Sequence, residues 1–144
     1  MASLATPEKS DDILIVLDTW DVPLSGVTMF EGAFHSFQRM FDEEAQSWAK
    51  SEGFLLQRLT GAELNQFNEL NELYVAWLAA HKDGKAGPHP LIPEAVGPSV
   101  DRYRELHSLT GAILLADTDR TVRCAGIITQ VPGEKRYIAH WQRS

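Results

Sequence analysis

Runs of apolar residues predict several β-strands along the chain. Ile13–Leu17 is an uninterrupted apolar run rich in β-branched residues, which predicts a strand that continues to about Trp20. Residues 53–59 show the same strand-like pattern. Three further strands are expected near the C-terminus, at 112–116, 121–130 and 135–141. The connections DTDR and Pro-Gly between these last strands are short, so we expect them to pair antiparallel.

Residues 20–44 combine turn signals with aromatic residues. Turn-forming residues at 23–26 predict a turn after the first strand. Two interpretations compete for 33–41, because its phenylalanines recur at helical spacing, whereas its alternate residues from His35 onward share one face of a strand. Gly32 tolerates the positive φ of a tight turn, which favours a hairpin between 27–30 and 33–41. A helix over 33–41 is the alternative.

The middle of the chain contains the clearest helix signal. Thr60 and Glu63 form a capping-box pattern, and apolar residues then recur every three or four positions, which predicts a helix over 61–83. The next segment, 84–98, has four prolines and three glycines, so we expect an irregular loop, and a loop of this length is usually functional or wrapped over the core. A short helix from Ser99 to about residue 109 should follow.

These elements predict an α+β protein. Strands, a helix, a loop, a short helix and strands follow one another without βαβ alternation. We therefore expect an antiparallel sheet, made of an N-terminal meander plus C-terminal strands, with one long helix and one short helix on one face. Residues 1–11 are expected to form a flexible tail and residues 12–144 a single α+β domain.

Charge and cysteine content narrow the range of functions. The chain of 144 residues has a net charge of −7 and scattered basic residues, which argues against nucleic-acid binding and favours a protein partner with a basic surface. Cys124 is the one cysteine, so no internal disulfide can form, and this indicates a cytoplasmic protein. The first apolar run has only five residues, too few for a secretory signal or a membrane span.

Candidate functional residues are few. The five histidines show no metal-ligand spacing, no phosphate-binding or nucleophile motif is present, and we expect no cofactor and no metal. His35 could join Asp18 or Asp21 at a metal site if the first strands form a meander, although a structural histidine is the simpler interpretation. The polar residues left over in the opening stretch, together with one tryptophan, are the candidate binding residues: Asp21, Ser25, His35, Asp42, Glu43, Glu44 and Trp48.

The opening stretch also resembles a group of uncharacterised bacterial proteins. The resemblance rests on Trp20-Asp21, Pro23 and Ser25-Gly26, which match a W-D-x-P-x-S-G start, and on an F-D-E-E close at 41–44. Trp77, Ala80 and His81 match a W-x-x-A/L-x-H helix end. The likeness covers roughly residues 15–85, and the segment 47–52 departs from it. The resemblance implies a bacterial, cytosolic protein and no particular activity.

Three hypotheses follow. The first is a small acidic binding protein without catalytic activity, for example a neutraliser of a basic protein partner. The second is a small-molecule-binding protein or enzyme with a pocket near Asp21, His35 and the 84–98 loop. The third is a homo-oligomer formed through exposed sheet edges. No membrane association is expected.

Overall fold

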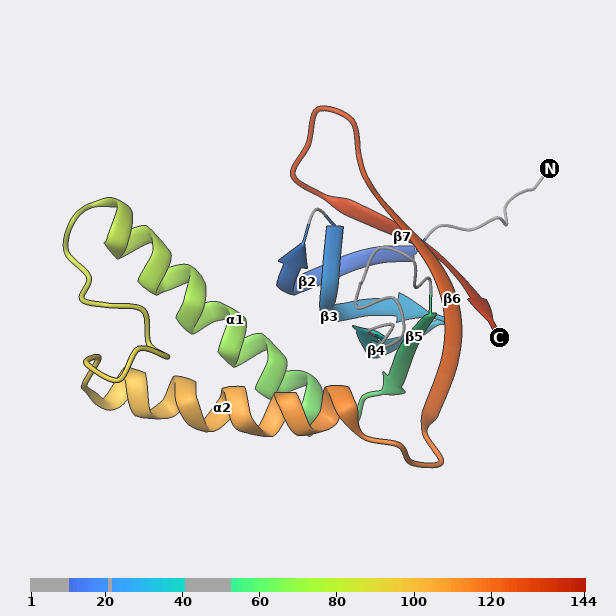
Figure 1. The fold of residues 1–144 in the computed structure, drawn as a ribbon, viewed down its shortest axis with the longest axis horizontal. Helices are drawn as coiled ribbons and strands as arrows, with labels where there is room; N and C mark the ends of the chain where they lie inside the picture. Colours follow the sequence, from blue (N-terminus) through green and yellow to red (C-terminus); the bar gives the residue numbers. More distant parts are fainter. Residues whose placement is uncertain (1–10, 21, 41–52) are drawn as a thin grey trace. The chain divides into compact units, whose positions relative to one another are not determined.

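The structure is a computed structural model that describes residues 11–20, 22–40 and 53–144, and its chain divides into two compact units (Figure 1). One unit comprises Met1–Leu59 and Leu114–Ser144, and the other comprises Thr60–Ile113. The strands are β2 (Asp11–Trp20), β3 (Val22–Phe30), β4 (Ala33–Arg39), β5 (Gly53–Arg58), β6 (Thr121–Gln130) and β7 (Tyr137–Arg143). The helices are α1 (Gly61–Lys82) and α2 (Pro98–Leu115).

The strands form a closed antiparallel barrel in the order β2-β3-β4-β5-β6-β7. The prediction of an open α+β sheet with helices on one face is therefore wrong. The ladder between β5 and β6 joins the N-terminal strands to the C-terminal ones, and pairs between Asp11 and Ala139 and between Asp12 and Ile138 close the barrel. Sequence patterns indicate which segments are strands, but closure depends on pairing between the two ends of the chain, which no local pattern reports.

The turn predicted at 23–26 is also wrong, because these residues lie inside β3. Gly26 allows β2 and β3 to approach closely, because a Cβ at this position would lie 1.9 Å from the carbonyl oxygen of Ile15. The β2–β3 ladder shifts register at three places, as expected for a strongly bent strand pair. Pro23 fits near the start of β3, opposite Thr19.

The hairpin predicted between 27–30 and 33–41 is confirmed over the described residues, and the helical alternative is excluded. Glu31 and Gly32 connect β3 to β4 with φ values of 50° and 76°. Two positive φ values are the mark of a type I′ turn, whose twist suits the flanking strands. Phe30 pairs with Ala33 directly next to the turn.

Aromatic side chains fill the barrel. Trp141 packs against Phe37 and Phe54, with ring centroids 5.6 and 5.0 Å away. Its ring lies on Gly126, where a Cβ would come within 2.4 Å of the indole. The buried members of the core are Ile13, Phe30, Phe37, Phe54, Leu56, Cys124 and Ala139. A packed interior of this kind leaves little internal space in so small a barrel.

The predicted long helix is confirmed in the helical unit, whereas the second helix is longer than predicted. Thr60 and Glu63 form the expected capping box at the start of α1. Helix α2 continues through Gly111 to Leu115, so the strand predicted at 112–116 is wrong. The buried positions of α2 explain its length, because they recur every three or four residues to the end: Tyr103, Leu106, Thr110 and Leu114.

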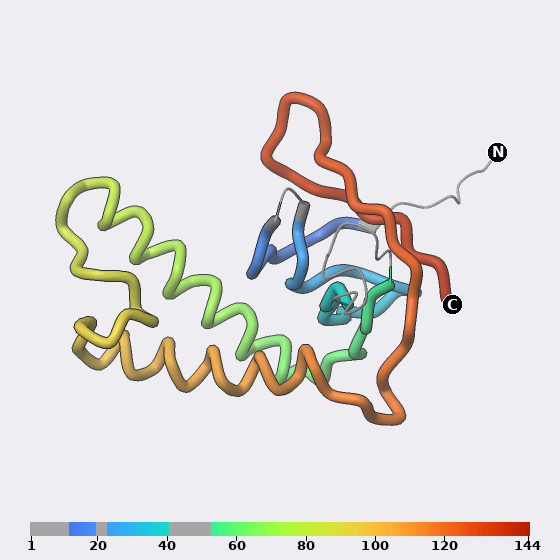
Figure 2. Tube along the Cα trace, in the orientation of Figure 1, coloured from blue at the N-terminus to red at the C-terminus, as the bar shows by residue number. Residues whose placement is uncertain are grey.

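The path of the chain between the helices is visible in Figure 2, where residues 84–98 (yellow) lead from α1 back to α2. Arg102 on α2 binds both carboxylate oxygens of Glu69 on α1 at 2.7 Å, which ties the helices together. Neither helix is long and apolar enough to cross a membrane.

The contact between Trp141 and Gly126 gives the first prediction. Gly126→Ala should lower the free energy of unfolding by about 1–3 kcal/mol, because the new methyl group overlaps the indole ring. Gly111→Ala is the matched control: it adds the same methyl group to a helix with no atom nearby and should raise stability by roughly 0.5–1 kcal/mol. Urea denaturation measures both. Equal stability of the two variants would contradict the packing described.

Candidate functional site

The structure describes two of the predicted binding residues, Ser25 and His35, and separates them. Ser25 pairs with Gln38, whereas His35 pairs with Thr28. Side chains alternate between the faces of a strand, so Ser25 and His35 lie on opposite faces of the β3–β4 pair. The other predicted binding residues lie outside the described part of the chain: Asp21, Asp42, Glu43, Glu44 and Trp48.

His35 is held as a structural residue. Its side chain is buried, its Nδ1 lies 3.0 Å from the carbonyl oxygen of Ala33, and the edge of its ring meets Phe30 at 5.3 Å. Burial lowers the pKa of His35, and the bond to Ala33 opposes this only in part. Asp18 pairs with Ser25, which places it on the opposite face from His35. The proposed metal pair of these two residues therefore does not form, and the described residues contain no cluster of three or more metal-ligating side chains.

Two buried hydroxyls on the outer face of β3 and β4 have no hydrogen-bond partner among the described residues. They belong to Ser25 and Ser36, which are diagonal neighbours because Val27 pairs with Ser36. Ser25 thus lies in a strand and not in the turn predicted at 23–26. An unpaired buried hydroxyl costs roughly 1–3 kcal/mol.

Cys124 is part of the core. It is fully buried on β6, and burial raises the pKa of its thiol to about 11. A thiol with so high a pKa is almost entirely protonated near neutral pH, and only the thiolate is a strong nucleophile. Cys124 is therefore accounted for by its packing in the core.

A single arginine holds the 84–98 loop. The guanidinium of Arg104 donates hydrogen bonds to three loop carbonyls: those of Pro90 at 2.9 Å, Ile92 at 2.8 Å and Ala95 at 3.2 Å. Trp77 on α1 donates a further bond to the carbonyl of Gly87 at 3.2 Å. Both helices therefore fix the loop, and the loop presents one defined surface.

That surface is apolar with an acidic residue in it. Leu91, Ile92 and Val96 are exposed by 42%, 43% and 85%. Glu94 lies among them in the sequence, is exposed, and has no ion-pair partner among the described residues. Apolar side chains exposed together on a fixed loop are a common feature of protein-binding surfaces.

An aromatic and histidine cluster joins this loop to the two helices. His89 contacts Trp77 at 5.1 Å and Tyr103 at 6.0 Å, while His81 stacks on Trp77 at 4.8 Å. His107 stacks on Tyr103 in the same way. Each of these imidazole rings packs on a neighbouring aromatic ring. These three histidines are accounted for by packing.

The helical unit carries unbalanced negative charge. Its Arg102 is occupied by Glu69 and Glu105, and its Arg104 is occupied by the loop carbonyls. The exposed acidic residues of this unit without an ion-pair partner among the described residues are Glu72, Asp83, Glu94 and Asp101. The other basic residues of this unit are Lys82 and Lys85. The loop surface is thus set in an acidic unit, which suits a basic partner.

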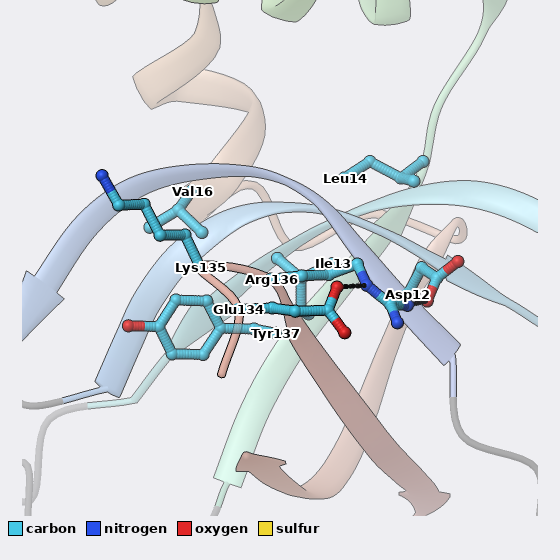
Figure 3. Close-up of a pocket in the computed structure, with 8 residues that line it drawn as sticks. All are labelled: Asp12, Ile13, Leu14, Val16, Glu134, Lys135, Arg136 and Tyr137. Carbon is cyan, nitrogen blue, oxygen red and sulfur yellow. Dashed lines mark hydrogen bonds and ion pairs between the residues drawn. The ribbon is translucent and has the colours of Figure 1, made fainter. Parts of the chain in front are cut away.

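The barrel unit has a groove of about 540 Å³ where β2 meets the β6–β7 connection (Figure 3). Strand β2 contributes Asp12, Ile13, Leu14 and Val16 to the groove. The other wall consists of Glu134, Lys135, Arg136 and Tyr137. Arg136 lies 3.3 Å from both Asp12 and Glu134, so one end of the groove is closed by an ionic group.

Sequence reasoning missed the residues that define both surfaces. Arg104 looks like any exposed helical arginine, and only its position beneath the loop reveals its role. The composition of 84–98 did indicate an unusual loop. The adjacent Lys135 and Arg136 are among the few grouped basic residues, but nothing in the sequence places them opposite β2.

Comparisons with protein-family models, curated proteins and solved structures give no match to this chain. The resemblance to uncharacterised bacterial proteins therefore stays a prediction. The function must be inferred from the two surfaces themselves.

The lowered pKa of His35 predicts a specific pH dependence of stability. The unfolded chain binds a proton at His35 near the ordinary pKa of about 6.5, whereas the folded chain binds it only at lower pH. Between these two values the unfolded state holds more protons, so this contribution to stability is present above about pH 6.5 and is lost as the pH falls toward the folded pKa. His35→Gln should reduce the loss of stability on acidification, as measured by urea denaturation at several pH values. His107→Gln is the control, and an unchanged pH dependence in His35→Gln would refute the assignment.

The Arg104 contacts predict that the loop depends on one side chain. Arg104→Met keeps the aliphatic stem but removes the three hydrogen bonds to the carbonyls. Amide hydrogen exchange at Ile92 and Ala95, whose N–H groups bond within the loop, should become about tenfold faster or more. Arg102→Met, which breaks the ion pairs with Glu69 and Glu105, is the control and should leave these two amides slow. Similar exchange in both variants would rule out the clamp.

Proposed function

We propose that this chain is a small acidic binding protein without catalytic activity, and that it engages a protein partner with a basic surface. The observation that carries the proposal is the 84–98 loop, which Arg104 fixes through three carbonyls while Leu91, Ile92 and Val96 stay exposed. A loop that is already ordered loses little conformational entropy when it binds. Exposed apolar side chains on such a loop can then gain free energy by burial against a partner.

The charges around the loop support a basic partner. Glu94 is exposed within the loop, and the helical unit adds Glu72, Asp83 and Asp101, whereas its two arginines are engaged in internal contacts. Charge complementarity of this kind speeds association and excludes partners of the wrong charge. The acidic cluster at 42–44 and Trp48, which are candidate binding residues, lie outside the described residues.

The second candidate, a small-molecule pocket or enzyme site near Asp21, His35 and the 84–98 loop, has less support. The polar contact of His35 is to a backbone carbonyl, and its ring packs on Phe30. The carbonyls of the loop that Arg104 binds are also engaged internally. We further propose that the protein acts in the cytoplasm, without nucleic acid or membrane partners, because its lone cysteine is a buried thiol and its basic residues are scattered.

The proposal predicts a salt-sensitive partner that depends on the loop. Tagged protein purified from its native host at low salt should retain a basic protein, and high salt should release it because screening weakens charge attraction. The double variant Ile92→Ser with Val96→Ser should retain at least about tenfold less partner, since it removes two apolar anchors. Glu94→Arg should weaken retention at low salt in particular.

Ile127→Ser is the matched control, because Ile127 is an equally apolar side chain, 58% exposed, on the barrel strand β6. It should retain the partner as the parent protein does. Failure to retain any protein at low salt would refute the proposal. Equal loss in the loop variant and in Ile127→Ser would refute the assignment to the loop.

A further inference from the structure

The barrel is closed by a short seam. Among the described residues, strand β2 pairs with β7 through two residue pairs, whereas each of the other ladders has five to seven. The last described pair joins Asp12 to Ile138. If the ladder continued, Ile13 would lie opposite Tyr137. Instead the strands part at this point, and the groove occupies the place of the missing pairs (Figure 3).

The floor of this groove belongs to the barrel core. Ile13 is a buried member of the core cluster, and Val16 and Tyr137 are partly buried against it. Leu14, which is 46% exposed, forms part of the outer wall. An apolar group in the groove would therefore contact side chains of the core without any rearrangement of the barrel. A volume of about 540 Å³ is within the usual range for small-molecule sites.

The charged side chains at the opening of the groove differ in whether they already form ion pairs. Arg136 lies between Asp12 and Glu134, and these three side chains together carry one net negative charge. Lys135 is exposed and has no ion-pair partner among the described residues. Figure 3 shows its ammonium group directed away from that ionic cluster, on the side of Val16 and the Tyr137 hydroxyl. The groove thus offers an exposed ammonium and, toward the same side of the view, a tyrosine hydroxyl (Figure 3).

We propose that the seam binds a small apolar carboxylate, with its hydrocarbon part on Ile13, Val16 and Tyr137 and its carboxylate at Lys135. The apolar floor supplies burial of hydrocarbon, and the free ammonium supplies a charge-assisted hydrogen bond to the carboxylate. A cationic amphiphile of equal length would gain the same burial but would be repelled by Lys135. A charge preference for anions therefore distinguishes this site from a non-specific apolar patch.

Addition of a peptide strand along β2 fits the seam less well. Three register shifts interrupt the pairing of β2 with β3, and such irregular strands make poor templates for a further strand. The charged side chains of Asp12 and Arg136 also flank the edge where pairing would begin. The geometry favours a compact ligand in the groove over an extended one along the strand.

Titration of the full chain with decanoate, followed by amide chemical shifts, tests the proposal. Shifts should centre on Ile13, Val16 and Tyr137, and decyltrimethylammonium should bind at least about tenfold more weakly. Lys135→Gln should weaken decanoate about tenfold or more, because it removes the charged partner of the carboxylate. Lys135→Arg should restore most of the affinity.

Lys85→Gln is the matched control, since it removes an exposed lysine from the helical unit and should leave decanoate binding unchanged. Any one of three results would overturn the proposal. These are no saturable binding of decanoate below its micelle concentration, equal binding of the cationic amphiphile, or equal binding by Lys135→Gln and the parent protein. None of them bears on the loop at 84–98, so the two proposals fail separately.

Discussion

Trp141 crosses the interior of the barrel, and it can do so because residue 126 has no side chain. The indole lies on Gly126 of the neighbouring strand, and its Nε1 donates a hydrogen bond to Thr28 Oγ1 at 3.0 Å. Thr28 in turn donates to the carbonyl of Asp12 at 3.0 Å, on the strand that closes the barrel. A chain of two hydrogen bonds and one large ring thus joins β7, β3 and β2 through the core.

This arrangement accounts for where the barrel stays closed and where it opens. The carbonyl of Asp12 is fixed from inside by Thr28, while the backbone of Asp12 pairs with Ile138 and its carboxylate contacts Arg136. Past this residue, β2 has no described β7 partner, and the groove begins. Because aromatic rings fill the centre of the barrel, the groove lies at this seam and is lined by core residues such as Ile13.

The sequence predicted local structure correctly at positions where the residue type has a single structural role, such as a turn or a helix cap. Glu31-Gly32 adopts the two positive φ values that its hairpin requires, and Thr60 with Glu63 caps α1 as expected. Residues 23–26 form a strand although their composition predicts a turn, because a glycine also suits a strand that another strand approaches closely, as the strand of Ile15 does here. The barrel itself could not be predicted, since its closure depends on pairing of residues more than a hundred positions apart, such as Asp12 with Ile138.

The sequence was also limited as a guide to the candidate sites. Polar residues in an apolar stretch were expected to mark function, yet His35 is a structural side chain bonded to a backbone carbonyl. His35 and Thr28 both form hydrogen bonds within the barrel unit, so polar residues on its strands did not mark a binding surface. The composition of the 84–98 loop was a better guide to a candidate surface. Its four prolines and three glycines prevent regular secondary structure, so side-chain contacts must fix the conformation of the loop. Arg104 does so by occupying three carbonyls, and a loop that is held in this way exposes its apolar side chains as a fixed surface.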